Sequence, residues 1–424
     1  MNLPKQDQPP LHPFTAVNTR PVNHYILKNS VQVYTIEAGT EDVMRIEFVF
    51  RAGIDKEYIP LLSSTTNMML TEGSLSHTAE EINSMLDYDG IFLNLVAEKD
   101  TAGVVLFFLS RKIEPVLDLV REIMFEPAFP EKELDILMKK RLRWFQVNRE
   151  RVQNLAMDKF FESVFGSGHS YGHQVTESDF TGLIPSVIKD FHSKYYRPAD
   201  MAVIISGRIA DDTLRMLEEK FGDISSSNVY IEESRAVLKG ETEKKIVIEK
   251  EGALQSAIRI GSTTINKRHP DYPGLKVLNV ILGGYFGSRL MRNIREEKGY
   301  TYGIHSLVSS LNLSGFKVIS TEVGKDKTSP ALHEIYKEIR LLQEKPVENS
   351  ELEVVRNYMS GEMIRMFDGP FALAESFKSV WEFGLDNSYF NLLAEKIRTI
   401  TPEEIMHLAN TYYKIDNLYE IVAG

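Results

Sequence analysis

Apolar and polar residues alternate along the first part of the chain, which is the pattern of half-buried β-strands. From Asn23, the segment HYILKNSVQVYTIEAG predicts a β-hairpin, and VMRIEFVFRAG predicts a third strand that ends at Gly53. Two helix-forming segments follow, PLLSSTTNMMLTEGS and HTAEEINSMLDYDG, and the second has a threonine cap, early glutamates and a final glycine. The next segment, IFLNLVAEKDTAGVVLFFLS, predicts two more strands.

Longer amphipathic helices come after these strands. RKIEPVLDLVREIMFE predicts one, and EKELDILMKKRLRWFQVNRERVQNLAMDKFFESVF predicts a second, longer one. GSGHSYGHQVTE contains three glycines and indicates a loop. His169 and His173 lie in it, four residues apart; that is a metal-ligand spacing on a helix, whereas a loop favours packing or hydrogen-bonding roles. SVIKDFHSKYYRPADMAVIISG then predicts a helix and a strand.

The second half of the chain repeats the first. DFHSKYYRPADMAVIISG, which ends at Gly207, matches LANTYYKIDNLYEIVAG, which ends at Gly424, at an offset of 217 residues. Glu133–Leu137 matches Glu351–Val355 at an offset of 218. Two homologous α/β units explain this near-constant register. Strands grouped in pairs and followed by helices predict an α+β fold, with an antiparallel or mixed sheet and helices on one side in each unit.

Composition sets the expected domain limits. Residues 1–22 are rich in proline and polar residues and predict a flexible N-terminal segment. Residues 23–223 form the predicted N-terminal domain, and residues 246–424 form its C-terminal homologue. Residues 224–245 lack periodicity, which is typical of a linker.

The overall composition is that of a soluble globular protein, with 43% hydrophobic and 26% charged residues. A formal net charge of −11 argues against non-specific binding to nucleic acid. The chain has no cysteine, which excludes disulfides and thiolate zinc ligands. It also has neither a signal-peptide pattern nor an apolar run of about 18 residues, so we expect a cytoplasmic protein with no membrane partner.

The stretch LGGYFGSRLMRNIREEKGYTYG, from Leu282 to Gly303, contains the most specific chemistry. It predicts a helix from about Ser288 to Lys298, with Arg295 in the last turn and Tyr302 at the start of the next strand. The two side chains could then converge on a ligand in front of one helix–strand corner. By spacing alone, an arginine near a helix end and a tyrosine in a strand are also ordinary structural choices.

The two α/β repeats, a strand ending in RAG, a helix ending in EGS, and LGGxxxSRLxxxIREEKGYTY together resemble the pitrilysin or insulinase family of zinc peptidases, over residues 23–424. The subunits of the mitochondrial processing peptidase and its bacterial relatives are the most similar in length. The resemblance implies that the two halves form a clam shell around an unfolded peptide. It also implies a zinc site made by an H-x-x-E-H motif and a later glutamate.

This chain departs from the family pattern at every zinc ligand. The motif positions fall on Ser64, Asn67 and Met68, and the later glutamate falls on Lys140. Neither H-x-x-E-H nor H-E-x-x-H occurs elsewhere in the sequence. These side chains cannot hold a catalytic zinc, and Asn67 cannot act as a general base, so we expect no metal cofactor in this chain.

The resemblance assigns other residues to substrate. Arg295 and Tyr302 match an arginine and a tyrosine that, in active relatives, hold the substrate backbone and stabilise the tetrahedral intermediate; Tyr300 lies close by and could be mistaken for the partner. Glycines at 283, 284 and 287 would let the backbone approach a peptide, or would simply form a tight turn. The predicted strand around Asn94, Leu95 and Val96 corresponds to the edge strand that pairs with extended peptide.

Lost zinc ligands beside a retained Arg295 and Tyr302 suggest a division of labour. The leading hypothesis is a non-catalytic subunit of a heterodimeric zinc metalloendopeptidase, inactive alone, whose homologous partner carries the zinc. The alternative is a non-enzymatic pseudopeptidase that binds unfolded or extended peptides, with a homodimer as one form. A third hypothesis, an autonomous metallopeptidase with an unrecognised site, requires zinc in the pure chain.

Overall fold

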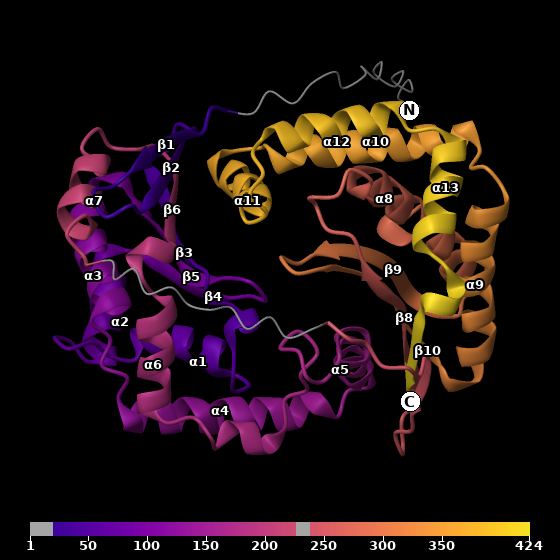
Figure 1. Cartoon of the computed structure of the whole chain (residues 1–424), viewed down its shortest axis with the longest axis horizontal. Coiled ribbons are helices and arrows are strands. Elements are labelled where there is room, and N and C mark those ends of the chain that lie inside the picture. The colour runs from indigo at the N-terminus through magenta and orange to yellow at the C-terminus, as the bar shows by residue number, and fades with distance from the viewer. Residues whose placement is uncertain (1–19, 226–237) are drawn as a thin grey trace, which may run out of the picture.

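The computed structural model describes residues 20–225 and 238–424. Most of the predicted N-terminal segment (1–22) and the middle of the predicted linker (224–245) lie outside these ranges. Figure 1 shows two α/β units that face each other, the first in indigo to magenta and the second in orange to yellow. The chain therefore has the predicted α+β clam-shell fold.

The first unit contains six strands and seven α-helices in its described part: β1 (Asn23–Ile26), β2 (Gln32–Glu37), β3 (Val43–Phe50), α1 (Leu62–Met68), α2 (Ala79–Asp89), β4 (Phe92–Ala97), β5 (Ala102–Leu109), α3 (Ile113–Phe125), α4 (Glu131–Arg149), α5 (Val152–Phe165), α6 (Pro185–Tyr195), β6 (Met201–Gly207) and α7 (Thr213–Phe221).

The second unit has a similar order, but two π-helical segments follow its first α-helix and no helix follows its last strand: β7 (Lys245–Ile248), β8 (Gln255–Thr264), α8 (Tyr272–Asn279), η6 (Val280–Gly284), η7 (Met291–Glu297), β9 (Thr301–Ser310), β10 (Gly315–Gly324), α9 (Thr328–Glu344), α10 (Asn349–Met366), α11 (Pro370–Trp381), α12 (Ser388–Thr399), α13 (Pro402–Tyr412) and β11 (Tyr419–Ala423).

The two sheets have the same strand order. The first sheet runs β1-β2-β6-β3-β5-β4, and the second runs β7-β11-β8-β10-β9. Apart from β1, each strand of the first sheet has a counterpart in the second, with one parallel pair (β2 with β6, β7 with β11) among antiparallel ones. The duplication seen in the sequence is therefore a duplication of the fold. β4 and β9 are equivalent edge strands of the two sheets, and β1 and β7 form the opposite edges.

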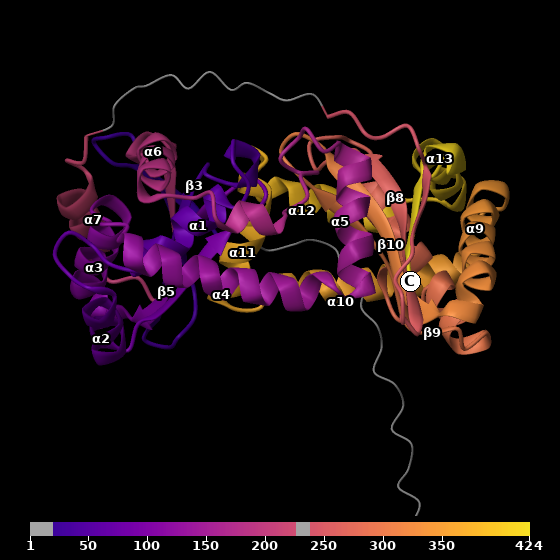
Figure 2. The same cartoon turned by 90° about the horizontal axis from the view of Figure 1, so that it is seen from below.

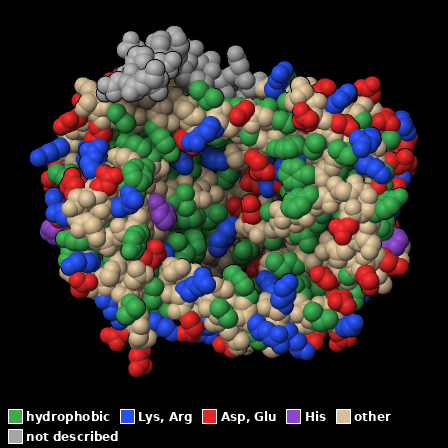
Figure 3. Space-filling view, turned by 180° about the vertical axis from the view of Figure 1, so that it is seen from behind, with side chains coloured by type: hydrophobic (Ala, Val, Ile, Leu, Met, Phe, Trp, Pro, Cys, Tyr) green, Lys and Arg blue, Asp and Glu red, His purple; other side chains and the backbone are tan. Residues whose placement is uncertain are grey.

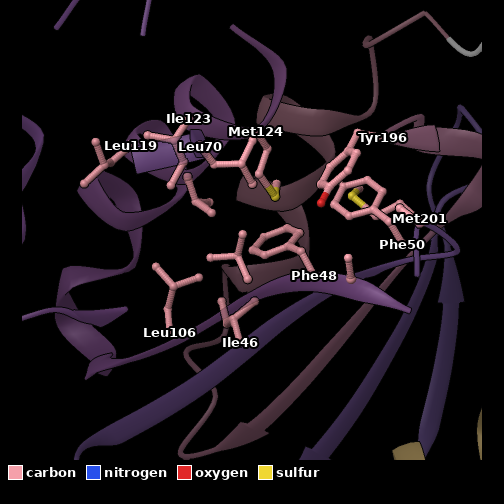
Figure 4. Close-up of a cluster of buried hydrophobic side chains, with 14 of the residues drawn as sticks. Ile46, Phe48, Phe50, Leu70, Leu106, Leu119, Ile123, Met124, Tyr196 and Met201 are labelled. Carbon is pink, nitrogen blue, oxygen red and sulfur yellow. The ribbon is translucent and has the colours of Figure 1, made fainter. Parts of the chain in front are cut away.

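One face of each sheet packs against the helices of its own unit. In the first unit, Ile46, Phe48, Phe50 and Leu106 of the strands contact side chains such as Met124 of α3, and they form the core shown in Figure 4. These side chains are almost fully buried. Burying apolar area of this extent is the main stabilising contribution in such a domain.

The segment 131–165, predicted as one long helix, forms two helices. The chain turns between Arg149 and Val152, where Arg151 has extended backbone angles. The side-chain amide of Asn154 donates to the carbonyl of Asn148 (2.8 Å), so this carbonyl at the end of α4 is satisfied outside the helix. The turn allows α5 to leave the direction of α4.

After this turn, α5 packs on the sheet of the other unit. Ala156 and Phe160 of α5 contact Phe316 and Ile421 of the second sheet, on the face away from α8 and α9. The equivalent helix of the second unit, α11, packs on the sheet of the first unit. Leu373, Ala374 and Phe377 of α11 contact Ile36, Val49 and Ile204 on the inner face of the first sheet. Figures 1 and 2 show α4 and α10 running between the units on opposite sides.

Buried charges support the contact made by α11. Lys378 of α11 pairs with Glu47 of β3 (2.7 Å), and Glu47 also accepts from Arg45 (2.6 Å). Glu375 of α11 pairs with Arg45 as well. Since Arg45 and Glu47 are 1% and 2% exposed, breaking one of these ion pairs would leave an uncompensated buried charge.

In the part of the chain that the structure describes, no helix is both long and apolar enough to cross a lipid bilayer.

Candidate functional site

Arg295 and Tyr302 meet at the corner between η7 and the edge strand β9. Arg295 Nε donates to the backbone carbonyl of Tyr302 (3.0 Å), and its guanidinium lies over the ring of Phe286, 4.7 Å from the centroid. The guanidinium has no other hydrogen bond or ion pair with the residues that the structure describes. The Tyr302 side chain is 94% exposed, and Phe286 is also exposed. The guanidinium of Arg295 is therefore fixed at this corner, and the phenol of Tyr302 on the same corner is open to solvent.

The predicted helix over 288–298 is π-helical from Met291 to Glu297 instead of α-helical throughout. Lys298 N donates to Asn293 O (3.0 Å), five residues back, and Gly299 has a φ of +65° where the chain reverses. The Asn293 side chain donates to Glu334 and Glu338 of α9, which holds this turn against the core. π-Helical turns are frequent at functional sites.

The glycines of the stretch differ in their surroundings. Gly283 is buried, and a Cβ there would lie 2.8 Å from the backbone nitrogen of Ser306 in β9. Its missing side chain thus permits close packing of η6 against β9. Gly284 and Gly287 are half-exposed, and a Cβ at Gly287 would meet the ring of Tyr285. The role of these glycines in binding a peptide stays a prediction.

The side chain of Arg141 lies beside Ser64, the first zinc-motif position. Arg141 of α4 donates from Nη2 to Ser64 Oγ (2.8 Å) and from Nη1 to Thr65 Oγ1. The half-buried Glu57 accepts from the backbone nitrogen of Ser63 (2.8 Å) and interacts electrostatically with Arg141. Burial raises the pKa of Glu57 to about 7 although this hydrogen bond and Arg141 both act to lower it.

The other motif positions have unrelated roles. Asn67 is buried, and its amide donates to the carbonyl of Gly103 (3.0 Å) and to the hydroxyl of Tyr196 (3.2 Å). Met68 is 41% exposed. Lys140 is exposed, close enough to Glu72 to affect its pKa. A serine bound to a guanidinium, an amide, a thioether and an ammonium do not fit a zinc ion.

The histidine pair of the loop does not form a ligand set. His169 is buried, and its Nδ1 accepts from the backbone nitrogen of Tyr171 (3.0 Å), whereas His173 is exposed. Across residues 20–225 and 238–424, no group of three or more side chains suited to a metal ion is found.

The strand that carries Asn94, Leu95 and Val96 is β4, the free edge of the first sheet, as predicted. Its hairpin meets the β9–β10 hairpin of the other unit, because Asp100 accepts from the backbone nitrogen of Asn312 (2.8 Å). The two edge strands thus belong to hairpins that touch at their tips. The face in Figure 3 is hollowed near its centre between the units, and Lys and Arg side chains gather along its lower rim, where α4 runs.

Two residues of this site were not found from the sequence. Arg141 follows directly after the motif position Lys140, but a motif search considers only the ligand positions themselves. Phe286 lies between Gly284 and Gly287, and flanking glycines indicate a turn rather than a functional aromatic residue. An arginine seven residues from a tyrosine, with an aromatic residue nine positions before the arginine, is too weak a pattern to use alone.

Comparison with known proteins identifies the class. Residues 183–359 match a protein family described as the peptidase M16 inactive domain. The uncharacterized zinc protease YmxG of Bacillus subtilis is 23% identical over 298 residues, covering 70% of this chain and 72% of the relative. The non-peptidase homolog YmxG of Helicobacter pylori is 20% identical over 381 residues, covering 88% and 87%.

Two solved structures have the same fold. A protease from Helicobacter pylori has a TM-score of 0.87 at 17% identity, with coverage of 96% of this chain and all of the other. A peptidase M16 inactive domain from Pseudomonas fluorescens has a TM-score of 0.83 at 21% identity, with coverage of 95% and 98%. Residues 183–359 thus match the inactive domain of M16 peptidases, and the fold of the described chain is that of the M16-type proteins compared with it.

Proposed function

We propose that this chain is the non-catalytic subunit of a heterodimeric zinc metalloendopeptidase. In this proposal, a homologous partner subunit supplies the zinc, and this chain contributes Arg295 and Tyr302 to the peptide carbonyl under attack. The substrate is an extended or unfolded peptide, because β4 offers an unpaired strand edge for it.

The observation that carries the proposal is the state of Arg295. Its Nε is held by the Tyr302 carbonyl and its face by Phe286, so the guanidinium is oriented before any ligand binds. The remaining donors of Arg295 and the phenol of Tyr302 are available to a carbonyl oxygen that becomes an oxyanion. Donors fixed in advance around developing charge contribute strongly to catalysis.

The state of the zinc-motif positions supports the proposal that a partner supplies the zinc. Ser64 and Asn67 hydrogen-bond within the fold, and Arg141 places a fixed positive charge among them. A cation at this position repels a metal ion. Arg295 and Tyr302 can therefore serve only a zinc ion that another subunit brings.

The test mixes the purified chain with a homologous subunit from the same source that has an intact H-x-x-E-H motif. The two chains together should hydrolyse a fluorogenic extended peptide that neither cleaves alone. Arg295→Ala should lower kcat of the mixture by about 100-fold or more, with a smaller change in KM, since its interaction strengthens in the transition state. Tyr302→Phe should lower kcat by about 10-fold or more.

Two neighbouring residues of the same types provide matched controls. Arg292→Ala removes an exposed arginine one turn away, and Tyr300→Phe removes the neighbouring phenol; both should leave kcat near the wild-type value. Size-exclusion chromatography of each mixture checks that the complex still forms. Full activity with Arg295→Ala or Tyr302→Phe would show that this chain does not act on the substrate in the proposed way.

A peptide-binding pseudopeptidase is the second candidate. The observation in its favour is that the equivalent edge strands β4 and β9 lie in the same chain and their hairpins touch. It predicts saturable binding of a fluorescent extended peptide by the isolated chain, with no hydrolysis after any partner is added. The same mixing experiment therefore separates the two functions.

A further inference from the structure

A polar cavity of about 320 Å³ lies at one end of the second sheet. It is lined by residues of α5, β8, β10, β11, the segment before β7 and the end of α13. The polar side chains that line it include Lys244, Ser262, Thr263, Lys317, Thr411 and Asn417. Thr411 and Asn417 are exposed, so the cavity opens to solvent on their side.

Lys317 of β10 is the unusual residue in this cavity. It is only 2% exposed, and its Nζ contacts Ser262 Oγ, the Thr263 carbonyl (3.4 Å) and the ring face of Tyr413 (5.3 Å to the centroid). No carboxylate of the described residues pairs with it. A buried ammonium without an anion is costly, and burial accordingly lowers the pKa of Lys317 to about 7.

A second lysine faces the same space. Lys244 is half-buried, and its Nζ lies 3.6 Å from the centroid of the Tyr419 ring. Among the described residues, no aspartate or glutamate lines the cavity. Two nearby carboxylates are engaged elsewhere, since Glu241 pairs with Lys159 (3.1 Å) and Asp271 accepts from the Tyr412 hydroxyl (2.7 Å).

We propose that this cavity binds a small oxyanion, such as a phosphate, a sulfate or a carboxylate group, between Lys317 and Lys244. The side-chain amide of Asn417 offers further donors, whereas the hydroxyl groups of Ser262 and Thr411 already donate to the carbonyls of Thr263 (2.9 Å) and His407 (2.9 Å). Charge-assisted hydrogen bonds of this kind are strong when they are shielded from water. In a chain with a net charge of −11, a cavity with two lysines and no acid is a local exception that suits an anion.

Binding should depend on pH because the anion requires the charged form of Lys317. The other titratable groups that line the cavity or contact Lys317 are Tyr412 and Tyr413 at the end of α13, Tyr419 of β11 and Lys244. Burial raises the pKa of Tyr413 to about 12, so its phenol stays neutral. Since the pKa of Lys317 is lowered, its charged form gains as pH falls through 7, and affinity should rise in that direction.

The experiment is isothermal titration calorimetry of the full chain with sodium sulfate, at constant ionic strength and at pH 6 and pH 8. Sulfate keeps its charge over this range, so a change in affinity reports the protein. We expect tighter binding at pH 6. Lys317→Met should weaken binding by about tenfold or more and remove the pH dependence.

A matched control is Lys245→Met, which removes the exposed lysine next to Lys244 and should leave sulfate binding unchanged. If Lys317→Met does not fold, Lys244→Met provides the second variant and should also weaken binding. Inorganic phosphate and acetate, titrated at pH 6.5, distinguish a phosphate ligand from a carboxylate ligand. No binding at millimolar sulfate, or equal affinity in wild type and variants, would overturn the proposal.

Discussion

At the residue scale, Arg141 is the side chain that most clearly separates this protein from a zinc peptidase. It hydrogen-bonds to Ser64 and Thr65, and it interacts with the half-buried Glu57. The positions of the lost ligands have therefore acquired other contacts. Restoring the zinc ligands at the motif positions alone should not restore zinc binding, because the guanidinium of Arg141 would stay beside the metal ion.

A reconstruction experiment tests this role of Arg141. The variant Ser64→His/Asn67→Glu/Met68→His/Lys140→Glu restores the family ligands and should still bind zinc poorly. Adding Arg141→Leu should strengthen zinc binding by about tenfold or more, because removing one unit charge close to a metal ion removes more than 1.4 kcal/mol of repulsion. Competition with a fluorescent zinc chelator measures both affinities. Adding Arg143→Leu instead, at an exposed position of the same helix, is the control and should change little.

Glu57 makes a second residue-scale prediction, on pH. Its folded-state pKa of about 7 lies above the ordinary value of 4.5, so its contribution to stability is fully present below pH 4.5 and is lost as pH rises through 7. Glu57→Gln should thus raise the free energy of unfolding at pH 8, by about 1 to 3 kcal/mol, and change it little at pH 4.5. Urea unfolding at both pH values measures the difference. Glu353→Gln, on the exposed face of α10, should show no such pH-dependent gain.

At the element scale, the sequence correctly predicted features that are visible in the order of the residues alone, such as helix ends and the internal repeat. Thr78 caps α2 and Glu81 completes a capping box, and Gly90 ends the helix in the left-handed region. The register between Gly207 and Gly424 predicted the duplication, and the matching strand orders confirm it. Propensity, capping residues and repeats are all visible without knowledge of the tertiary fold.

Other elements depend on contacts that no local pattern contains. The turn at Arg151 has neither glycine nor proline, and it forms where Asn154 bonds to the end of α4. The π-helical turn of η7 is held by Asn293, which reaches α9 about 40 residues further along the chain. The amphipathic patterns of α5 and α11 showed that each helix has a buried face, but could not show which sheet would bury it.

At the scale of the whole molecule, each unit packs one helix on the sheet of the other unit, a reciprocal contact that we call the clasp. α5 of the first unit covers the inner face of the second sheet, and α11 of the second unit covers the inner face of the first. The two helices are equivalent at the sequence offset of 218, and Ala156 in α5 corresponds to Ala374 in α11. On the first sheet, α11 reaches from Tyr34 of β2 to Phe107 of β5. The edge strand β4 lies beyond this contact, which supports β4 as the place where an extended peptide would bind.

The clasp predicts that charged substitutions at two alanines far apart in the sequence have the same effect, namely separation of the two units. Ala156 and Ala374 are fully buried, and an arginine at either position would place an unpaired charge between a helix and the sheet of the other unit. Ala156→Arg and Ala374→Arg should each separate the units and increase the radius of gyration measured by small-angle X-ray scattering. Far-UV circular dichroism should show that the helices persist, because each unit keeps its own core. Leu392→Arg, at an exposed position of α12, is the matched control. If the alanine variants lose thermal stability without any increase in the radius of gyration, α5 and α11 are ordinary core helices and the units do not open at this contact.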